Sequence, residues 1–479
     1  MLLVIVSLFT AILINTGSYL YAQKAPLRIS EPIDSVIADL KGYIPYRMHE
    51  ADIPGLAIAL IRDNKIVWTD GFGVTSRLTN KPVSSKTVFE VASISKVVSV
   101  YTALRLVEQG KLSLDKPVKI YLKKTWLPPS KYADKITLRH LLSHSSGLGD
   151  DMLFMNKNIV FEPGSDFLYS GVGFLYVQEV IEQLTGNSLE KAARKYVFDP
   201  LVMTSSSFFN ETSVMNDIAS GHVYYTLPLL AFLIPFIISL VIVSIISLTA
   251  NRIIKKSWRL SRQLIVIVFV ISFVLTESLI YLLIGKPFPN LIWSNIICAI
   301  VFLSLLILSY LLFRRLITFL LPTRQKKVLT AILSIAWILI IIVIFLKIAN
   351  SINGPLPKNN SSYVSAIGSL RASAPDLATF LIELANPRYL GEDIASQIDS
   401  TQVKINQDFS WGLGVGIQHS MYGNAIWQNG ITFGYRSVMV IYPRKGHGVV
   451  VLTNSESGLP VAYDIAERAL GGKAQWKSF

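Results

Sequence analysis

A serine and a lysine three residues apart, Ser93 and Lys96, are the pair in this sequence best suited to covalent chemistry. Residues three apart on a helix are neighbours, with Cβ atoms about 5–6 Å apart, so the hydroxyl and the amine can meet. A serine hydroxyl becomes a good nucleophile when a base takes its proton, and a lysine can take it only as the neutral amine. The pair therefore predicts a serine nucleophile with a lysine as its proton acceptor.

The Ser-x-x-Lys spacing recurs at Ser113 and at Ser188. The sequence around each serine therefore has to show which one is the candidate nucleophile. Ser113 follows Gly110 and Ser188 follows Gly186, and both are predicted to be loop or capping serines. Ser93 instead opens residues 93–109, where apolar residues recur at helical spacing up to Gly110. We therefore expect the nucleophile at the start of this helix.

The elements that position the pair come from two separated segments of the chain. Residues 52–75 have the pattern of a β-hairpin with a polar turn at 62–65. Residues 411–417, 435–442 and 448–452 are predicted strands, and residues 460–470 a closing helix. The first segment begins a sheet and the second continues it, so we expect residues 30–224 and 354–479 to form one domain, with 350–362 as a linker.

Four apolar runs lie between these segments, at residues 226–250, 264–284, 291–313 and 328–346. Each approaches or exceeds the roughly 20 residues that span a bilayer. Basic residues gather between the first and second runs and between the third and fourth, which predicts that those two loops are cytoplasmic. Residues 225–349 are thus predicted to be four transmembrane helices of a multi-pass cell-membrane protein, with both flanking segments outside the cytoplasm.

The composition supports membrane residence and argues against nucleic acid as a partner. Hydrophobic residues make up 51% of the 479 residues and charged residues 16%, which is more apolar than a typical soluble protein. The net charge of +14 arises largely from basic residues that flank the apolar runs. The only cysteine, Cys298, lies inside such a run, which excludes an intrachain disulfide. Residues 1–22 are predicted to be a signal peptide or an uncleaved anchor.

Longer motifs connect the sequence to a known family. The stretch FEVASISK at 89–96, followed by ITLRHLLSHSSGL at 136–148, resembles the beta-lactamase-related serine hydrolases, which include class C beta-lactamases, penicillin-binding proteins, D-alanyl-D-alanine carboxypeptidases, D-aminopeptidases and esterases. Further matches are YSGVGF at 169–174, SLRASAPDLATF at 369–380 and VVVLTN at 449–454. The resemblance implies an α/β fold, a beta-lactamase/transpeptidase-like antiparallel sheet flanked by helices plus an all-helical domain, here interrupted by the four-helix transmembrane unit.

The resemblance also implies roles for individual residues. Ser93 is the acylated nucleophile, Lys96 the proton shuttle, and Tyr169 the second base or acid. The backbone N–H groups of Ser93 and Ile431 are the two oxyanion donors. Such donors do not depend on the side chain, and each is typically worth about 2.7–4 kcal/mol of barrier.

Two positions depart from the family pattern. The third family motif, a Lys or His followed by any residue and Gly, aligns with Gln428, Asn429 and Gly430, ahead of Ile431. Gln428 therefore stands where the family has a cation, and Gly171 stands where the family has the Asn of its Tyr-x-Asn element. The first departure removes a charge that binds a substrate carboxylate, and the second removes an amide that contacts the substrate carbonyl. Both are compatible with a neutral acyl substrate or with an inactive site.

His140 and His144 stand four apart and invite comparison with a metal site, but no carboxylate or third histidine follows at ligand spacing. Neither a phosphate-binding loop nor a dinucleotide fingerprint occurs, so no metal and no cofactor is predicted.

We expect a membrane-anchored, extracytoplasmic serine hydrolase, of carboxypeptidase, aminopeptidase or esterase type, that forms an acyl-enzyme with a cell-envelope peptide, amide or ester. Two alternatives stay open. One is an inactive relative that binds an envelope ligand as a sensor. The other is a transporter, suggested by Glu277 inside the second apolar run.

Overall fold

The computed structural model describes residues 26–149, 157–209, 214, 216–224, 353–355, 363–472, 474 and 476. The predicted signal or anchor, the four predicted transmembrane runs and most of the predicted linker lie outside the described residues. Within the described part, no helix is both long enough and apolar enough to cross a bilayer. The chain divides into two compact units, one made of Met1–Val223 with Pro355–Phe479 and the other of Tyr224–Gly354.

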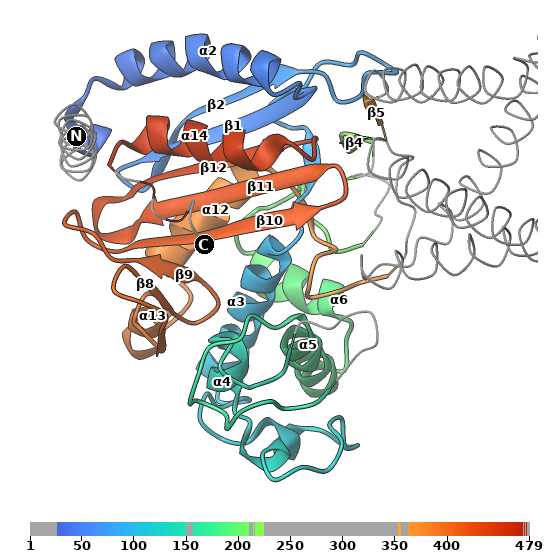
Figure 1. Ribbon diagram of the computed structural model, residues 1–479. Coiled ribbons are helices and arrows are strands. Elements are labelled where there is room, and N and C mark those ends of the chain that lie inside the picture. Colours follow the sequence, from blue (N-terminus) through green and yellow to red (C-terminus); the bar gives the residue numbers. More distant parts are fainter. Residues whose placement is uncertain are drawn as a thin grey trace, which may run out of the picture. The chain divides into compact units, whose positions relative to one another are not determined.

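Most described strands belong to one antiparallel sheet (Figure 1). Its strands are β1 (Gly55–Arg62), β2 (Lys65–Gly73), β7 (Val403–Lys404), β8 (Phe409–Trp411), β9 (Gly416–Gln418), β10 (Ala425–Thr432), β11 (Tyr435–Tyr442) and β12 (His447–Thr453). Their order is β2-β1-β12-β11-β10-β9-β8-β7. Because β1 pairs with β12, the sheet combines strands from both sides of the apolar runs. Two short pairs stand apart, namely β3 (Val88–Glu90) with β6 (Arg371–Ser373) and β4 (His222–Tyr224) with β5 (Asn353–Pro355).

Helices cover both faces of the sheet. The helices are α2 (Ile33–Glu50), α3 (Ile94–Glu108), α4 (Leu138–Leu142), α5 (Gly171–Thr185), α6 (Leu189–Ala193), α12 (Ala374–Ala385), α13 (Glu392–Ile398) and α14 (Gly458–Leu470). Figure 1 shows α2 and α14 on one face and α12 on the other, while α3 to α6 gather beyond the edge of the long strands. This arrangement confirms the predicted antiparallel sheet with flanking helices and a separate helical region.

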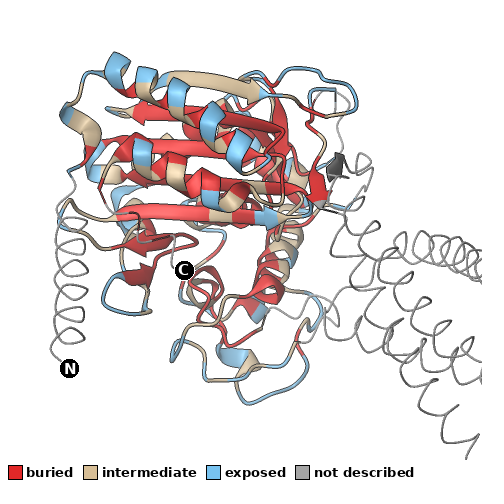
Figure 2. Cartoon of the chain, turned by 45° about the horizontal axis from the view of Figure 1, so that its top comes forward, coloured by how far each residue is buried: buried red, intermediate tan, exposed pale blue. Residues whose placement is uncertain are grey.

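The side-chain alternation of β1 explains why both faces need cover. Successive residues of a strand point to opposite faces. Leu56, Ile58 and Leu60 pack in the core beneath α2 and α14. Ala57 and Ala59 pack in the core that includes α3 and α12. A strand buried on both faces is apolar throughout, and Figure 2 shows the long central strands as buried.

One predicted element is wrong. Residues 411–417 were expected to form a single strand, but the structure has the hairpin β8–β9 there. The turn depends on two glycines. A Cβ at Gly412 would overlap the Ile398 carbonyl oxygen, and Gly414 has φ +81°, which favours glycine. The apolar pattern of this stretch therefore reflects burial on two short strands. The predicted linker also contains the short strand β5.

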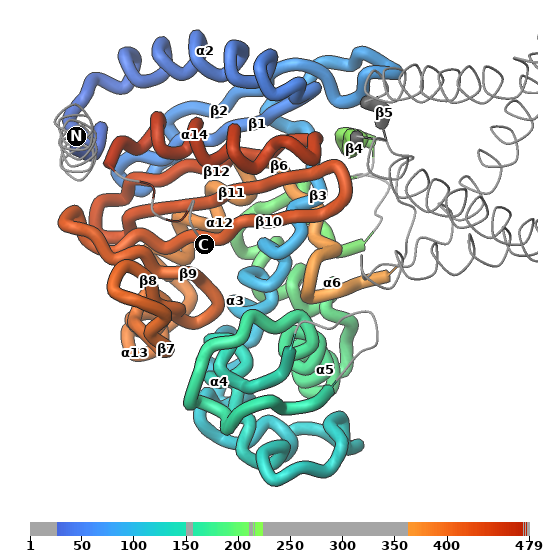
Figure 3. The backbone as a smooth tube through the Cα atoms, in the orientation of Figure 1, coloured from blue at the N-terminus to red at the C-terminus, as the bar shows by residue number. Residues whose placement is uncertain are grey.

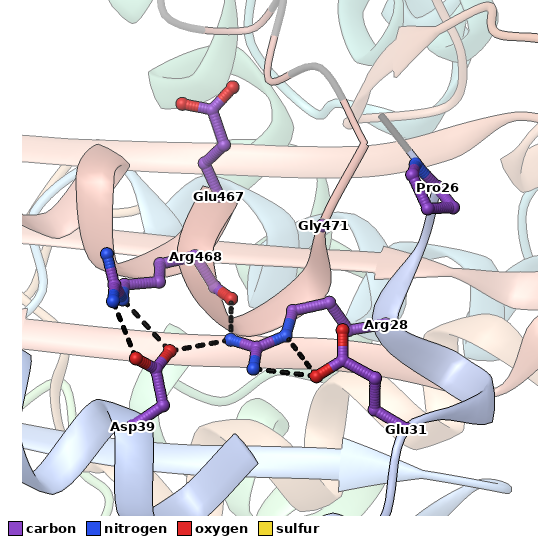
Figure 4. Close-up of a pocket in the computed structure, with 7 residues that line it drawn as sticks. All are labelled: Pro26, Arg28, Glu31, Asp39, Glu467, Arg468 and Gly471. Atoms are coloured by element: carbon purple, nitrogen blue, oxygen red, sulfur yellow. Dashed lines mark hydrogen bonds and ion pairs between the residues drawn. The ribbon is translucent and has the colours of Figure 1, made fainter. Parts of the chain in front are cut away.

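A cluster of ion pairs ties the first described residues to α2 and α14 (Figure 4). Arg28 donates to Glu31, to Asp39 and to the Arg468 carbonyl oxygen at 2.7–2.9 Å. Arg468 also binds Asp39, and its hydrogen bonds, ahead of those from Arg28, hold the pKa of that carboxyl below its usual value. A shallow pocket is lined by Pro26, Arg28, Glu31, Asp39, Glu467, Arg468 and Gly471. Because Arg28, Arg468, Glu31 and Asp39 neutralise one another, we assign the pocket a structural role.

Candidate active site

A tight turn between β3 and α3 presents Ser93. Ala92, immediately before it, has φ +49°, a left-handed conformation that costs a residue with a side chain about 1–3 kcal/mol. Residues that follow the apolar runs in the sequence hold the turn in place. Strand β6 belongs to these residues and pairs with β3, as Figure 3 shows. The Val91 N–H donates to the Leu370 carbonyl at 3.0 Å, and the Leu370 N–H donates to the Ser95 Oγ at 2.9 Å.

The hydroxyl of Ser93 and the amine of Lys96 meet as their spacing predicts. Lys96 Nζ lies 3.0 Å from Ser93 Oγ. Ser93 is partly exposed, whereas Lys96 is 3% exposed, so a substrate can reach the hydroxyl while the amine stays inside. Lys96 Nζ also donates to the carbonyl oxygen of Ile367 at 3.2 Å. This acceptor was not foreseen, because no sequence spacing relates positions so far apart.

Tyr169 completes the cluster from the loop that precedes α5. Lys96 Nζ lies 4.9 Å from the centroid of the Tyr169 ring. Gln428 is buried, and its Nε2 lies 3.4 Å from the Tyr169 hydroxyl oxygen. Gly171 is the first residue of α5, where the Ser170 Oγ caps the helix by accepting from the Gly173 N–H at 2.8 Å. The fold thus gathers Ser93, its lysine, the tyrosine and Gln428 into one place.

Strand β10 passes close to the turn that carries Ser93. A Cβ at Gly430 would overlap the Val91 carbonyl oxygen and the Ser437 Oγ, so only glycine lets β10 pack this closely against the turn. Ser437 Oγ donates to the same Val91 carbonyl at 3.1 Å. Ile431, whose N–H is the expected second oxyanion donor, follows directly, and its side chain is 55% exposed. The close packing of β10 on the turn is what sets the distance between the two expected donors.

One predicted site residue has its side chain elsewhere. Asn429 alternates with Gln428 along β10, so its side chain lies on the opposite face of the strand. There its Nδ2 donates to the hydroxyl of Tyr463 in α14 at 2.6 Å. The structure does not bring the Asn429 side chain to Ser93, because the period of a strand sends neighbours to opposite faces.

Sequence reasoning overlooked the place of His144. Its ring stacks on Tyr169 with centroids 4.3 Å apart and an interplanar angle of 29°. Complete burial, together with the charge of Lys96, holds the pKa of His144 well below its ordinary value. His140 lies apart from this contact and caps α4, accepting the Thr137 N–H at its Nδ1. Within the described ranges, His, Cys, Asp and Glu side chains do not form groups of three or more that could hold a metal ion.

The fold and this cluster define a beta-lactamase/transpeptidase-like α/β protein with a Ser-x-x-Lys pair. Residues 40–231 and 347–473 match the family model described as Beta-lactamase, and the chain belongs to that family. The first matched range ends at residue 231, inside the first apolar run, and the second begins at residue 347, directly after the fourth.

Curated relatives match over part of their length. The chain is 29% identical over 189 residues to "Penicillin-binding protein 4" of Amycolatopsis lactamdurans, covering 36% of this chain and 49% of the relative. It is 28% identical over 218 residues to "Esterase EstB" of Burkholderia gladioli, covering 38% of this chain and 54% of that protein. The chain therefore spans about half the length of these relatives.

A solved structure has the same fold. The octameric penicillin-binding protein homologue from Pyrococcus abyssi superposes with a TM-score of 0.58 at 19% identity, covering 90% of this chain and 76% of that one. At this level of identity the likeness concerns the fold alone.

Proposed function

We propose that this protein is a serine hydrolase that forms an acyl-enzyme at Ser93. The observation that carries the proposal is the 3.0 Å contact between Ser93 Oγ and Lys96 Nζ, with the Tyr169 ring beside the amine. General-base and nucleophilic catalysis need this kind of hydrogen-bond reach.

In the proposed reaction, neutral Lys96 takes the Ser93 proton as Oγ bonds to the substrate carbonyl carbon. The oxyanion that forms accepts hydrogen bonds from the N–H groups of Ser93 and Ile431. Collapse of this intermediate breaks the bond to the leaving group, which receives the proton from Lys96 through Tyr169. Water then adds to the acyl-enzyme, and the same groups return a proton to Ser93 Oγ as the acid is released.

We propose a neutral acyl substrate, such as an ester or an amide of the cell envelope without a carboxylate beside the scissile bond. Gln428 supports this choice because a neutral amide occupies the position where the family resemblance implies a cation. A carboxylate gains about 1.5–3 kcal/mol from a charged hydrogen bond, and Gln428 does not offer that charge.

For the whole protein we propose anchorage in the cell membrane by the four apolar runs, with the hydrolase domain outside the cytoplasm. The support is the length of the runs and the distribution of basic residues between them. Protease digestion of sealed, right-side-out vesicles tests this topology, since cleavage in the hydrolase domain without lysis is the expected result.

The test of activity is labelling of the full-length protein by a fluorophosphonate probe, with intact-mass spectrometry to locate the adduct. Wild type is expected to carry one adduct on Ser93, and Ser93→Ala none. Ser113→Ala is the matched control, because Ser113 belongs to another Ser-x-x-Lys motif and its Oγ accepts a hydrogen bond from the Asp115 N–H in a loop.

The second candidate is a ligand-binding sensor without hydrolytic activity. Gly171 and Gln428 favour it, since both replace side chains that the family uses toward substrate. Absence of Ser93-dependent labelling, combined with absence of hydrolysis over a broad panel of esters and amides, would overturn the enzyme proposal and favour this candidate.

A further inference from the structure

His144 accepts hydrogen bonds from the backbone on both sides of Tyr169. The Leu168 N–H donates to the His144 carbonyl oxygen at 2.8 Å. The Ser170 N–H donates to the His144 Nδ1 at 2.9 Å. One residue therefore accepts hydrogen bonds from both neighbours of the tyrosine, so Tyr169 cannot shift without breaking one of them.

The same residue also supports the tyrosine ring. The His144 and Tyr169 rings stack at 4.3 Å, while Lys96 Nζ lies 4.9 Å from the centroid of the tyrosine ring. Phe174 and Trp411 contact the imidazole from other sides, at centroid distances of 5.1 and 5.2 Å. With 1% of its surface exposed, His144 has little freedom to move.

Two further features suit His144 to a fixed, neutral role. Its backbone has φ +57°, in the left-handed region, so the chain accepts strain to place this side chain. Its Nδ1 accepts a hydrogen bond and therefore carries no proton, which makes the ring neutral with its proton on Nε2. A neutral ring brings no positive charge beside the Lys96 amine when that amine holds the Ser93 proton. Among the described residues, the titratable side chains that act on the His144 ring are Lys96 and Tyr169.

We propose that His144 is a positioning residue that holds the Tyr169 hydroxyl in place for proton transfer. This inference rests on the proposed hydrolase function. Acylation depends on placement at the scale of 1 Å, and a misplacement of that size can cost roughly a hundredfold in rate. His144 acts through Tyr169 and does not touch the reacting atoms.

A double-mutant cycle tests the proposal, with the second-order rate of Ser93 acylation by a p-nitroanilide, whose amine leaving group has to receive a proton, as the readout. His144→Phe keeps an aromatic ring but removes the acceptor for the Ser170 N–H, and it is expected to slow acylation at least about tenfold. In the Tyr169→Phe background the same change is expected to have less than about a twofold effect, because the hydroxyl it positions is absent. His140→Asn, which removes an imidazole four residues away, is the matched control and is expected to leave the rate unchanged.

An equal loss in both backgrounds, or no loss in either, would overturn the proposal, since His144 would then act independently of Tyr169. Should His144→Phe not fold, His144→Asn enters the same cycle, because asparagine tolerates a positive φ and keeps an acceptor near the Nδ1 position. The asparagine variant is expected to lose part of the rate, again only when Tyr169 is present. Failure of wild type both to label at Ser93 and to hydrolyse the panel of esters and amides would overturn the hydrolase function itself, whereas an active protein without coupling would overturn only the role of His144.

Discussion

Gly430→Ala is the substitution for which the structure most directly predicts a loss of catalysis. The added Cβ would overlap the Val91 carbonyl oxygen and the Ser437 Oγ, and the carbonyl is backbone that cannot rotate away. Either β10 or the turn before Ser93 then has to move by about 1 Å to restore an ordinary van der Waals separation. The movement separates the two expected oxyanion donors.

The size of the effect follows from hydrogen-bond geometry. An oxyanion donor acts at about 2.7–3.1 Å, so a displacement of about 1 Å takes the Ile431 N–H out of range. Loss of one such donor costs about 2.7–4 kcal/mol, which corresponds to about a 10²- to 10³-fold lower kcat. We expect Gly430→Ala to lower the acylation rate by this amount.

The assay is single-turnover acylation by a p-nitrophenyl ester, together with thermal unfolding to confirm that the variant is folded. Gly42→Ala is the matched control, because Gly42 is exposed in the middle of α2 and a Cβ there meets nothing within 4 Å. That change should stabilise the fold by roughly 0.5–1 kcal/mol and leave the rate alone. A folded Gly430→Ala protein with the wild-type acylation rate would refute the reasoning, because the close approach of β10 would then be irrelevant to the chemistry.

Three further outcomes are expected. Tyr169→Phe should lower the rate of acylation by a p-nitroanilide, whose amine leaving group needs a proton, by about 10²- to 10⁴-fold with little change in melting temperature, since the ring can still stack on its histidine; a rate near wild type would remove the phenol from the mechanism. Gln428→Lys should raise the ratio of penicillin acylation to neutral-ester acylation by roughly 10- to 100-fold, because it supplies a cation for the carboxylate, and Gln428→Met, which adds no charge, should not. Burial lowers the pKa of His222 and of His447 in the folded protein. A histidine in the unfolded chain has a pKa of about 6.5, so below that pH the unfolded chain binds more protons than the folded protein. Stability should therefore fall as pH drops through and below that value, by up to about 1.4 kcal/mol per pH unit for each histidine, and His447→Gln should reduce the slope in urea unfolding measured between pH 7.5 and pH 5.5.

The local elements were largely predictable from the sequence. The helix after Ser93 follows from apolar spacing, and Gly110, with φ +68°, lies just beyond its end as expected. Ser188 caps α6 by accepting the Lys191 N–H, as its position after a glycine suggested. The exception lies at residues 411–417, where the apolar residues predict one strand but Gly412 and Gly414 allow a turn that divides it.

The candidate site was only partly predictable. The resemblance named Ser93, Lys96 and Tyr169, and the fold gathers them. Strand alternation, a local property, could have shown that Asn429 and Gln428 point to opposite faces. Sequence spacing offered no signal that the Ile367 carbonyl would accept a hydrogen bond from the lysine amine.

What the sequence by itself determined is the pair of chemical groups, the order of the elements and the separation of the domain into two segments, because these depend on spacing and periodicity along the chain. What only the tertiary structure decided is the approach of β10 to Val91, the Ile367 acceptor and the contact of His144 with Tyr169. These contacts join residues brought together by the pairing of β3 with β6 and β1 with β12, and by left-handed backbone at Ala92 and His144. Their geometry depends on how closely buried surfaces pack, which no local pattern encodes.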